Sequence, residues 1–205
     1  MIFLTCFPFS YLDASLTLVR CDMGAKYPGV WVYLRRWKGV KVRSERSRFV
    51  WRAPLISGLG CGMTVGLLYW LSFDVELILC FVAPLGASSA LVFAAPEAPF
   101  SQPRNVILGH FLSALVGVII WRLLGDVLWT WLLVGMASGL AVILMIVTET
   151  VHPPAAVTAF LPILMGIGDF LWPFVPVGLG AVIVVISGLL YNNIYSERRY
   201  PFFWW

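Results

Sequence analysis

Apolar residues along the chain gather into six runs, separated by short segments that carry prolines, glycines or charges. A helix needs about 20 mostly apolar residues to cross the hydrocarbon core of a bilayer. The runs cover residues 53–73, 77–95, 105–125, 127–148, 153–168 and 171–193. The fifth is the shortest and contains Pro162, and Pro84 lies in the middle of the second. The pattern predicts six transmembrane segments, of which the second and fifth are broken or short at proline.

The composition indicates a protein that is dissolved in lipid rather than in water. Hydrophobic residues make up 60% of the 205 residues, charged residues only 12%, and the mean hydropathy is +0.90. A soluble domain usually carries about twice that charged fraction. The four cysteines show no spacing typical of a metal site or a disulfide framework. We therefore expect one all-α membrane domain with no metal and no cofactor.

Basic residues are concentrated ahead of the first apolar run. Ten of the 14 Lys and Arg residues lie between Arg20 and Arg52, and Arg198 and Arg199 follow the last run. Positive charge collects on the cytoplasmic side of membrane proteins, so both termini are predicted to be cytoplasmic, with an even number of crossings. The predicted domains are a basic interfacial segment (1–52), a transmembrane domain (53–193) and a cytoplasmic tail (194–205). Aromatics mixed with these cations indicate a lipid anchor rather than a nucleic-acid site.

Two short stretches in the abnormal runs resemble each other. "PLGASSAL" (84–91) and "PAAVTAFL" (154–161) both begin with proline, carry small residues and a hydroxyl at Ser88 or Thr158, and end in leucine. They occupy the second run of the first three and the second run of the last three. A three-helix unit that is used twice must enter the membrane from opposite sides. The pattern therefore predicts a 3+3 inverted repeat with a substrate site near the bilayer midplane.

Proline suits the first turn of a helix, so Pro84, Pro153 and Pro154 are predicted to start short helices. The first turn leaves backbone N–H groups unpaired at the positive end of the helix dipole. Two such starts facing each other would bind a small anion. The substrate-binding residues predicted in this way are Gly86, Ala87, Ser88, Ser89, Ala155, Ala156, Val157 and Thr158. The competing interpretation is tight helix packing, because small residues also mark close contacts between membrane helices.

A few other polar residues lie in or beside the apolar runs, and in a membrane protein such residues usually face the interior. They are Arg104, Asn105, His110, Glu149 and His152. Arg104 is either an attractor for anions or a headgroup contact, with Asn105 near the helix N-cap. His110 lies beside a small-residue stripe of Gly109, Ser113 and Gly117, and is either a packing residue or a substrate contact.

Glu149 and His152 are three residues apart near the end of the fourth run and can share a helix face. A histidine beside a carboxylate is a candidate proton relay, because histidine titrates near neutral pH. The alternative is that both residues end the helix at the cytoplasmic interface, where His152 caps backbone carbonyls.

Three blocks of sequence together resemble the HPP family of integral membrane proteins. They are "GASSALVFAAPEAP" and "QPRNVILGHFLSALVG" within 86–117, followed by "TVHPPAAVTA" (150–159), which contains the tripeptide of the family name. The resemblance covers Arg52 to about Asn193. Cyanobacterial and plastid members are described as nitrite transporters. The resemblance thus implies a nitrite transporter in the plasma membrane of a bacterium or cyanobacterium.

The expected function is transport of a small monovalent anion, with nitrite as the implied substrate. Either facilitated diffusion or proton-coupled uptake is compatible with the sequence, the second needing a titratable group among His152, Glu149 and His110. A carrier for a neutral solute and a non-transporting membrane scaffold or sensor are the alternatives. No catalytic motif is present, so the chain is not expected to be an enzyme. A homo-oligomer is expected because six helices enclose little space.

Overall fold

The computed structural model describes residues 52–71, 79–194 and 198–204, and all regular structure in these ranges is helical. Each of the six predicted apolar runs contains a helix, so the prediction of an all-α architecture is confirmed for the described residues. Three helices are long enough and apolar enough to cross a membrane: α2 (Arg52–Leu71), α4 (Pro103–Leu124) and α5 (Thr130–Val147). Residues Pro173–Asn192 form a fourth such segment. Residues 1–51 of the predicted basic segment and residues 72–78, between the first two helices, lie outside the described residues.

The two remaining helices are short, and they are the two predicted to be abnormal. The helix α3 (Leu79–Ala94) has 16 residues and α6 (Ala155–Met165) has 11. At 1.5 Å per residue, α6 rises only about 16 Å along its axis, roughly half the thickness of the hydrocarbon core. The chain on either side of α6 must therefore complete the path. Residues 148–154, which join α5 to α6 and carry His152, precede it, and we call them the histidine connection.

Pro84 does not start a helix, contrary to the sequence prediction. It lies inside α3, which continues without a break on both sides of it. The prediction for Pro153 and Pro154 is confirmed, because α6 begins at the next residue, Ala155. The helix ends at Gly166, whose φ of 67° allows the Ile167 N–H to donate to the Pro162 carbonyl at 2.8 Å.

The last segment changes geometry part-way along. A wide turn, η3 (Pro173–Gly178), contains Val175 in an extended conformation with φ −135° and ψ 116°. The helix α7 (Leu179–Asn192) follows directly. Pro176 lacks an N–H and cannot continue a regular ladder of hydrogen bonds, which explains why the regular α-helix begins only after it.

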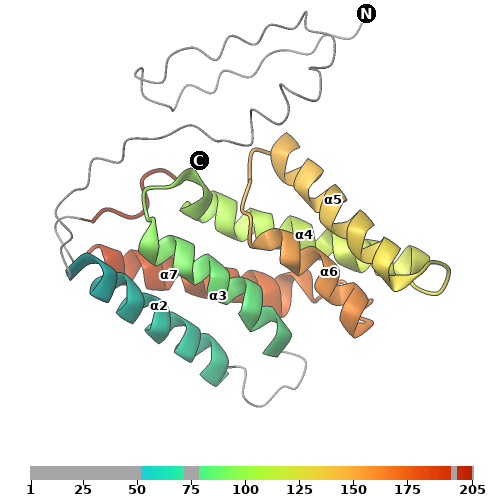
Figure 1. The fold of residues 1–205 in the computed structure, drawn as a ribbon, viewed down its shortest axis with the longest axis horizontal. Coiled ribbons are helices and arrows are strands. Elements are labelled where there is room, and N and C mark those ends of the chain that lie inside the picture. Colours follow the sequence, from blue (N-terminus) through green and yellow to red (C-terminus); the bar gives the residue numbers. More distant parts are fainter. Residues whose placement is uncertain (1–51, 72–78, 195–197, 205) are drawn as a thin grey trace, which may run out of the picture. The chain divides into compact units, whose positions relative to one another are not determined.

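The helix α4 occupies the centre of the bundle and packs against α5, α6 and α7 (Figure 1). Its contact with α6 is especially close at Gly117. A Cβ atom there would collide with the Ala159 carbonyl oxygen and reach the Pro162 side chain at 3.0 Å. At Gly109 a Cβ would lie 2.9 Å from the His152 Cβ. The stripe of small residues on α4 therefore permits the close approach of α6 and the histidine connection.

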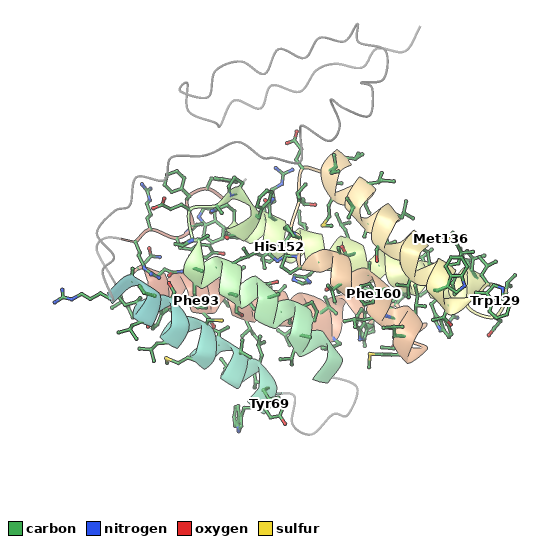
Figure 2. All side chains as sticks on the ribbon, in the orientation of Figure 1. Tyr69, Phe93, Trp129, Met136, His152 and Phe160 are labelled. Atoms are coloured by element: carbon green, nitrogen blue, oxygen red, sulfur yellow. The ribbon has the colours of Figure 1, made fainter. Side chains whose placement is uncertain are left out.

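The outer faces of α2 and α5 are apolar and exposed, as expected for surfaces in contact with lipid. Large exposed side chains include Trp70, 72% exposed, near the end of α2 and Trp129, 76% exposed, at the start of α5. Figure 2 shows Tyr69, Trp129 and Met136 at the edges of the bundle, whereas His152 lies deep within it. Aromatic side chains of this kind often lie at the membrane–water interface.

The predicted C-terminal tail packs against the transmembrane domain. Tyr200 is 1% exposed, and its hydroxyl donates to the Ser101 carbonyl at 2.9 Å. Arg198 donates to the Ala53 carbonyl at 2.9 Å and to the Ser57 hydroxyl at 2.8 Å, at the start of α2. The residues 198–204 are therefore structurally part of the domain that precedes them.

Candidate functional site

Four polar side chains from different elements meet in the interior of the bundle, each with 0% exposure. Ser88 Oγ, on α3, lies 2.7 Å from His110 Nε2, on α4, and 2.7 Å from His152 Nε2. His110 Nδ1 lies 2.7 Å from the Thr158 hydroxyl, on α6. We call Ser88, His110, His152 and Thr158 the histidine–hydroxyl cluster. Both hydroxyls named by the repeated motif and both histidines of the chain belong to it.

The backbone fixes the direction of every hydrogen bond in this cluster. His152 Nδ1 lies 2.6 Å from the Phe100 carbonyl, and a carbonyl oxygen can only accept. Nδ1 therefore carries the hydrogen of the neutral His152 ring, and Nε2 accepts from Ser88. The Ser88 oxygen is then free to accept from His110 Nε2–H, and Thr158 donates to His110 Nδ1. The neutral cluster is a chain of hydrogen bonds with one direction.

The two imidazole rings also touch each other, with centroids 5.0 Å apart and planes at 62°. His152 lies between α5 and α6 and is fully buried, and burial favours the uncharged form of an imidazole. An uncharged ring is compatible with the accepting role that its Nε2 atom has in the chain of hydrogen bonds.

The connection that carries His152 is held by the first turn of α4. Arg104 donates to the Thr148 carbonyl at 2.9 Å, and Asn105 donates to the Val151 carbonyl at 2.9 Å. Asn105 therefore has a definite structural partner beyond its predicted place near the N-cap. Arg104 is half-buried and satisfies the end of α5, so we describe it as a positioning residue. These two hydrogen bonds hold the segment that carries His152 against the first turn of α4.

Glu149 and His152 do not share a face. Glu149 is exposed and has a φ of 56°, so it ends α5 in the left-handed conformation, where the Thr150 N–H bonds back to the Met145 carbonyl at 2.9 Å. The helix-end interpretation is therefore confirmed for Glu149. It is wrong for His152, which is fully buried and whose side chain bonds to Phe100 and Ser88 rather than capping α5.

The predicted cradle of unpaired helix-start amides does not form. At the start of α6, the N–H groups of Ala155, Ala156 and Val157 donate to the carbonyls of residues 152–154, at 2.9 to 3.2 Å. The first turn is tightened, so these donors are used within the chain. On α3 the amides of residues 86–89 lie in the middle of a continuous helix, because Pro84 does not start it. The backbone thus offers no anion site at either place.

Several residues of the predicted site lie apart from the cluster. Ala87 and Val157 are exposed on the outer faces of their helices. A Cβ on Gly86 would meet only a Val65 methyl at 3.7 Å, so no close approach requires glycine there. Ser89 is buried, but its hydroxyl donates to the Leu85 carbonyl of its own helix at 2.9 Å. Of the "GASS" stretch, only Ser88 reaches the cluster.

Ser113 belongs to the stripe of small residues on α4. Its exposure is 0%, and among the described residues it is the one buried side chain whose polar atom has no hydrogen-bond partner. It lies on α4 three residues after His110, a spacing that places two side chains on one helix face. A buried hydroxyl without a partner costs about 1–3 kcal/mol, so Ser113 is available to a ligand or a water. In the sequence, the spacing of three residues between His110 and Ser113 indicates that both side chains lie on one face of α4.

A buried cluster of imidazoles and hydroxyls inside a bundle of apolar helices defines a polytopic membrane protein with a polar centre. The family described as "HPP, transmembrane region" matches residues 46–201, and the chain belongs to this family of integral membrane proteins. This match extends beyond both ends of the predicted transmembrane domain, 53–193, and takes in part of the C-terminal segment that packs against it.

Two curated proteins of Dictyostelium discoideum are similar to this chain, and both are described as transmembrane proteins. One is 34% identical over 180 residues, which cover 84% of this chain and 57% of that protein. The other is 36% identical over 129 residues, which cover 60% of this chain and 45% of that protein. The chain thus spans about half the length of these relatives. No solved structure matches it.

Proposed function

We propose that this protein transports a small monovalent anion across the membrane, with nitrite as the substrate, and that the histidine–hydroxyl cluster is its polar centre. The observation that carries the proposal is the burial of Ser88, His110, His152 and Thr158 at 0% exposure inside an apolar bundle. Polar side chains are expensive in that environment, and those that persist usually mark a pathway or a binding site.

The cluster offers groups that can contact an anion once it enters. The hydroxyl and imidazole donors of the cluster bond to one another and to the Phe100 carbonyl, so an anion takes them in exchange for these partners. Ser113 adds a hydroxyl that has no protein partner among the described residues. A small anion with several acceptor oxygens can take such donors without a large cavity. Nitrite itself comes from the resemblance to described family members rather than from the geometry.

The architecture supports alternating access through two related halves. Exchanging α2 with α5, α3 with α6 and α4 with α7 converts the α2–α3 contact into α5–α6, α2–α7 into α5–α4, and α3–α7 into α6–α4, all of which occur. The α3–α6 and α4–α7 contacts map onto themselves. This is the pattern that a 3+3 inverted repeat with six crossings generates, and its axis passes near the α3–α6 contact, where Ser88 and Thr158 lie.

The orientation follows from the same scheme. We propose that both termini are cytoplasmic and that the connection carrying His152 reaches the cluster from the cytoplasmic side, because His152 precedes α6 and contacts the connection between α3 and α4. A cleft of about 420 Å³ at the opposite end of α4 is lined by Trp121, Arg122, Asp126, Gly166 and Gly168. Arg122 places a cation at this outer mouth. A bacterial or cyanobacterial plasma membrane and a homo-oligomer complete the proposal.

One observation favours a second candidate, a carrier for a neutral polar solute. Among the described residues, none of the fully buried polar side chains is a lysine or arginine, and the burial of both histidines favours their uncharged forms. Such a centre binds hydrogen-bonding solutes without needing a charge on them. Competition between nitrite and a small neutral solute for uptake separates the two candidates.

The test is uptake into liposomes that contain the purified full-length chain. Nitrite influx is compared with that of nitrate, chloride and formate, and with influx into liposomes without protein. We expect nitrite to enter several times faster than in protein-free liposomes and to be favoured over chloride. Nitrite entry at the protein-free rate refutes the proposal. A complete absence of solute flux would instead support a scaffold or sensor role.

A further inference from the structure

We propose that the histidine–hydroxyl cluster binds a single proton, shared between His152 and Ser88, and that this proton crosses the membrane together with the anion. The inference rests on the proposed function and deepens it, because it selects proton-coupled uptake over simple diffusion. It is carried by the geometry around one atom, Ser88 Oγ, which has three partners within hydrogen-bonding distance but only one hydrogen to give.

The three partners of Ser88 Oγ are the Pro84 carbonyl at 2.9 Å, His110 Nε2 at 2.7 Å and His152 Nε2 at 2.7 Å. In the neutral cluster the Ser88 hydrogen points to His152 Nε2, which has no hydrogen of its own. The oxygen accepts from His110 Nε2–H, and the Pro84 carbonyl does not receive the hydroxyl hydrogen of Ser88. A carbonyl oxygen has two lone pairs, so the Pro84 carbonyl can still accept this hydrogen beside the backbone bond of its helix.

That acceptor is what the added proton requires. A proton that arrives binds the lone pair of His152 Nε2, and the new N–H donates to Ser88 Oγ. The Ser88 hydrogen rotates to the Pro84 carbonyl, and the bonds from His110 Nε2–H and from Thr158 stay as they were. Every donor in the cationic cluster then has an acceptor at a distance already present in the structure.

A second proton has no comparable binding site in the cluster. It would have to bind His110 Nδ1, and the adjacent cationic ring, with centroids 5.0 Å apart, would repel it. The histidine–hydroxyl cluster therefore carries a charge of either zero or +1. Ser88 acts as a pivot, and its helix supplies the alternative acceptor one turn earlier.

The charged groups around the cluster leave the added charge uncompensated. Glu149, on the connection, and Glu97, between α3 and η2 (Pro99–Ser101), are both exposed. Arg104 donates to the Thr148 carbonyl, and Arg122 lies at the far end of α4. The described side chains of α3 and of α6 include no titratable group. Because no carboxylate faces the cationic ring, the natural counter-ion is the transported anion.

Proton and anion then favour each other's binding. An anion beside the cluster stabilises the charged form of His152, and by linkage the protonated cluster binds the anion more tightly by the same factor. The pair carries no net charge, which removes the large cost of carrying a bare ion through an apolar interior. The expected stoichiometry is one proton for each anion.

The test uses liposomes that contain the full-length chain, with a pH-sensitive dye inside and the membrane potential clamped at zero. Nitrite is added outside, and internal acidification is measured beside nitrite entry, with protein-free liposomes subtracted from both. We expect about one proton for each nitrite, and uptake that rises several-fold when the external pH falls from about 7.5 to 6. Nitrite entry without proton entry would overturn the inference and leave the proposed function standing.

A second measurement is independent of transport. In full-length protein with ¹⁵N-labelled histidine, NMR chemical shifts distinguish a protonated ring nitrogen from an unprotonated one. Near pH 7.5 we expect opposite neutral tautomers, with the hydrogen of His110 on Nε2 and that of His152 on Nδ1. Acidification in the presence of nitrite should protonate one ring only. The same tautomer in both rings, or simultaneous protonation of both, would overturn the inference even if no solute moves.

Discussion

The helices α3 and α6 contain similar stretches of sequence but are built differently. Pro84 lies inside α3, which runs on through it, whereas α6 begins only after Pro154. Both nevertheless present a hydroxyl four residues after proline, and Ser88 and Thr158 reach the two different ring nitrogens of His110. The repeated motif is therefore expressed in the placement of two hydroxyls around one imidazole rather than in two matching helix starts.

The difference teaches why the two halves are not interchangeable. Thr158 has one partner in the cluster, whereas Ser88 bonds both histidines and keeps a carbonyl of its own helix in reach. A serine inside a helix can bond the carbonyl of residue i−4, and Ser88 Oγ lies 2.9 Å from the Pro84 carbonyl of α3. That carbonyl is the third partner of Ser88.

Packing provides the largest expected contrast between the two helices. Gly117→Ala on α4 should destabilise the protein by about 1–3 kcal/mol, because its Cβ would overlap the Ala159 carbonyl oxygen of α6. Gly86→Ala on α3 is the matched control, since its Cβ meets only a Val65 methyl at 3.7 Å. Thermal unfolding in detergent measures both. Equal losses, or a larger loss for Gly86→Ala, would show that α6 is not the tightly seated helix.

The second-largest expected effect comes from removing the one hydrogen bond that Thr158 makes in the cluster. Thr158→Val keeps the shape of the side chain but leaves His110 Nδ1 without a donor, which costs about 1–3 kcal/mol, and we expect nitrite influx to fall several-fold. Thr64→Val is the control, because the Thr64 hydroxyl is also buried but donates to the Gly60 carbonyl of its own helix at 3.0 Å. Influx assays in liposomes compare the two. Equal influx in both variants would remove Thr158 from the site.

The smallest effect concerns the end of α5, before the histidine connection. Glu149→Gly should stabilise the protein by roughly 0.5–1 kcal/mol, because glycine adopts a left-handed conformation without the steric cost of a Cβ. The exposed carboxylate takes no part in the cluster, so we expect unchanged nitrite influx. Thermal unfolding and influx are measured on one preparation. A strong loss of influx would restore Glu149 to the proton pathway.

Much of the fold could be predicted from the sequence because a bilayer leaves few choices. Apolar run length sets the helices, and proline with small residues marked the second and fifth as short. The continuity of α3 could not be predicted. Proline is compatible with both a first turn and an interior kink, and the side chains around Pro84 decide between them.

The site was predicted in its residues more than in its chemistry. Ser88 and Thr158 followed from the repeat, and His110 and His152 from their rarity in apolar runs. The sequence could not show that the amides of Ala155, Ala156 and Val157 bond back to their own turn, because first-turn geometry depends on local backbone angles. Nor could it show that Ser88 and His152, 64 positions apart, lie within hydrogen-bonding distance, since such pairs arise only from tertiary packing.

Nitrite influx through Ser88→Ala and Ser89→Ala tests the central claim most directly. These neighbours on α3 are both fully buried and receive the same substitution, but only Ser88 contacts the cluster, whereas Ser89 bonds to its own helix. We expect Ser88→Ala to lower influx at least about tenfold, equivalent to about 1.4 kcal/mol, while Ser89→Ala stays within about twofold of the native protein. Equal influx through the two variants, with both folded, would contradict the assignment of the histidine–hydroxyl cluster as the transport centre.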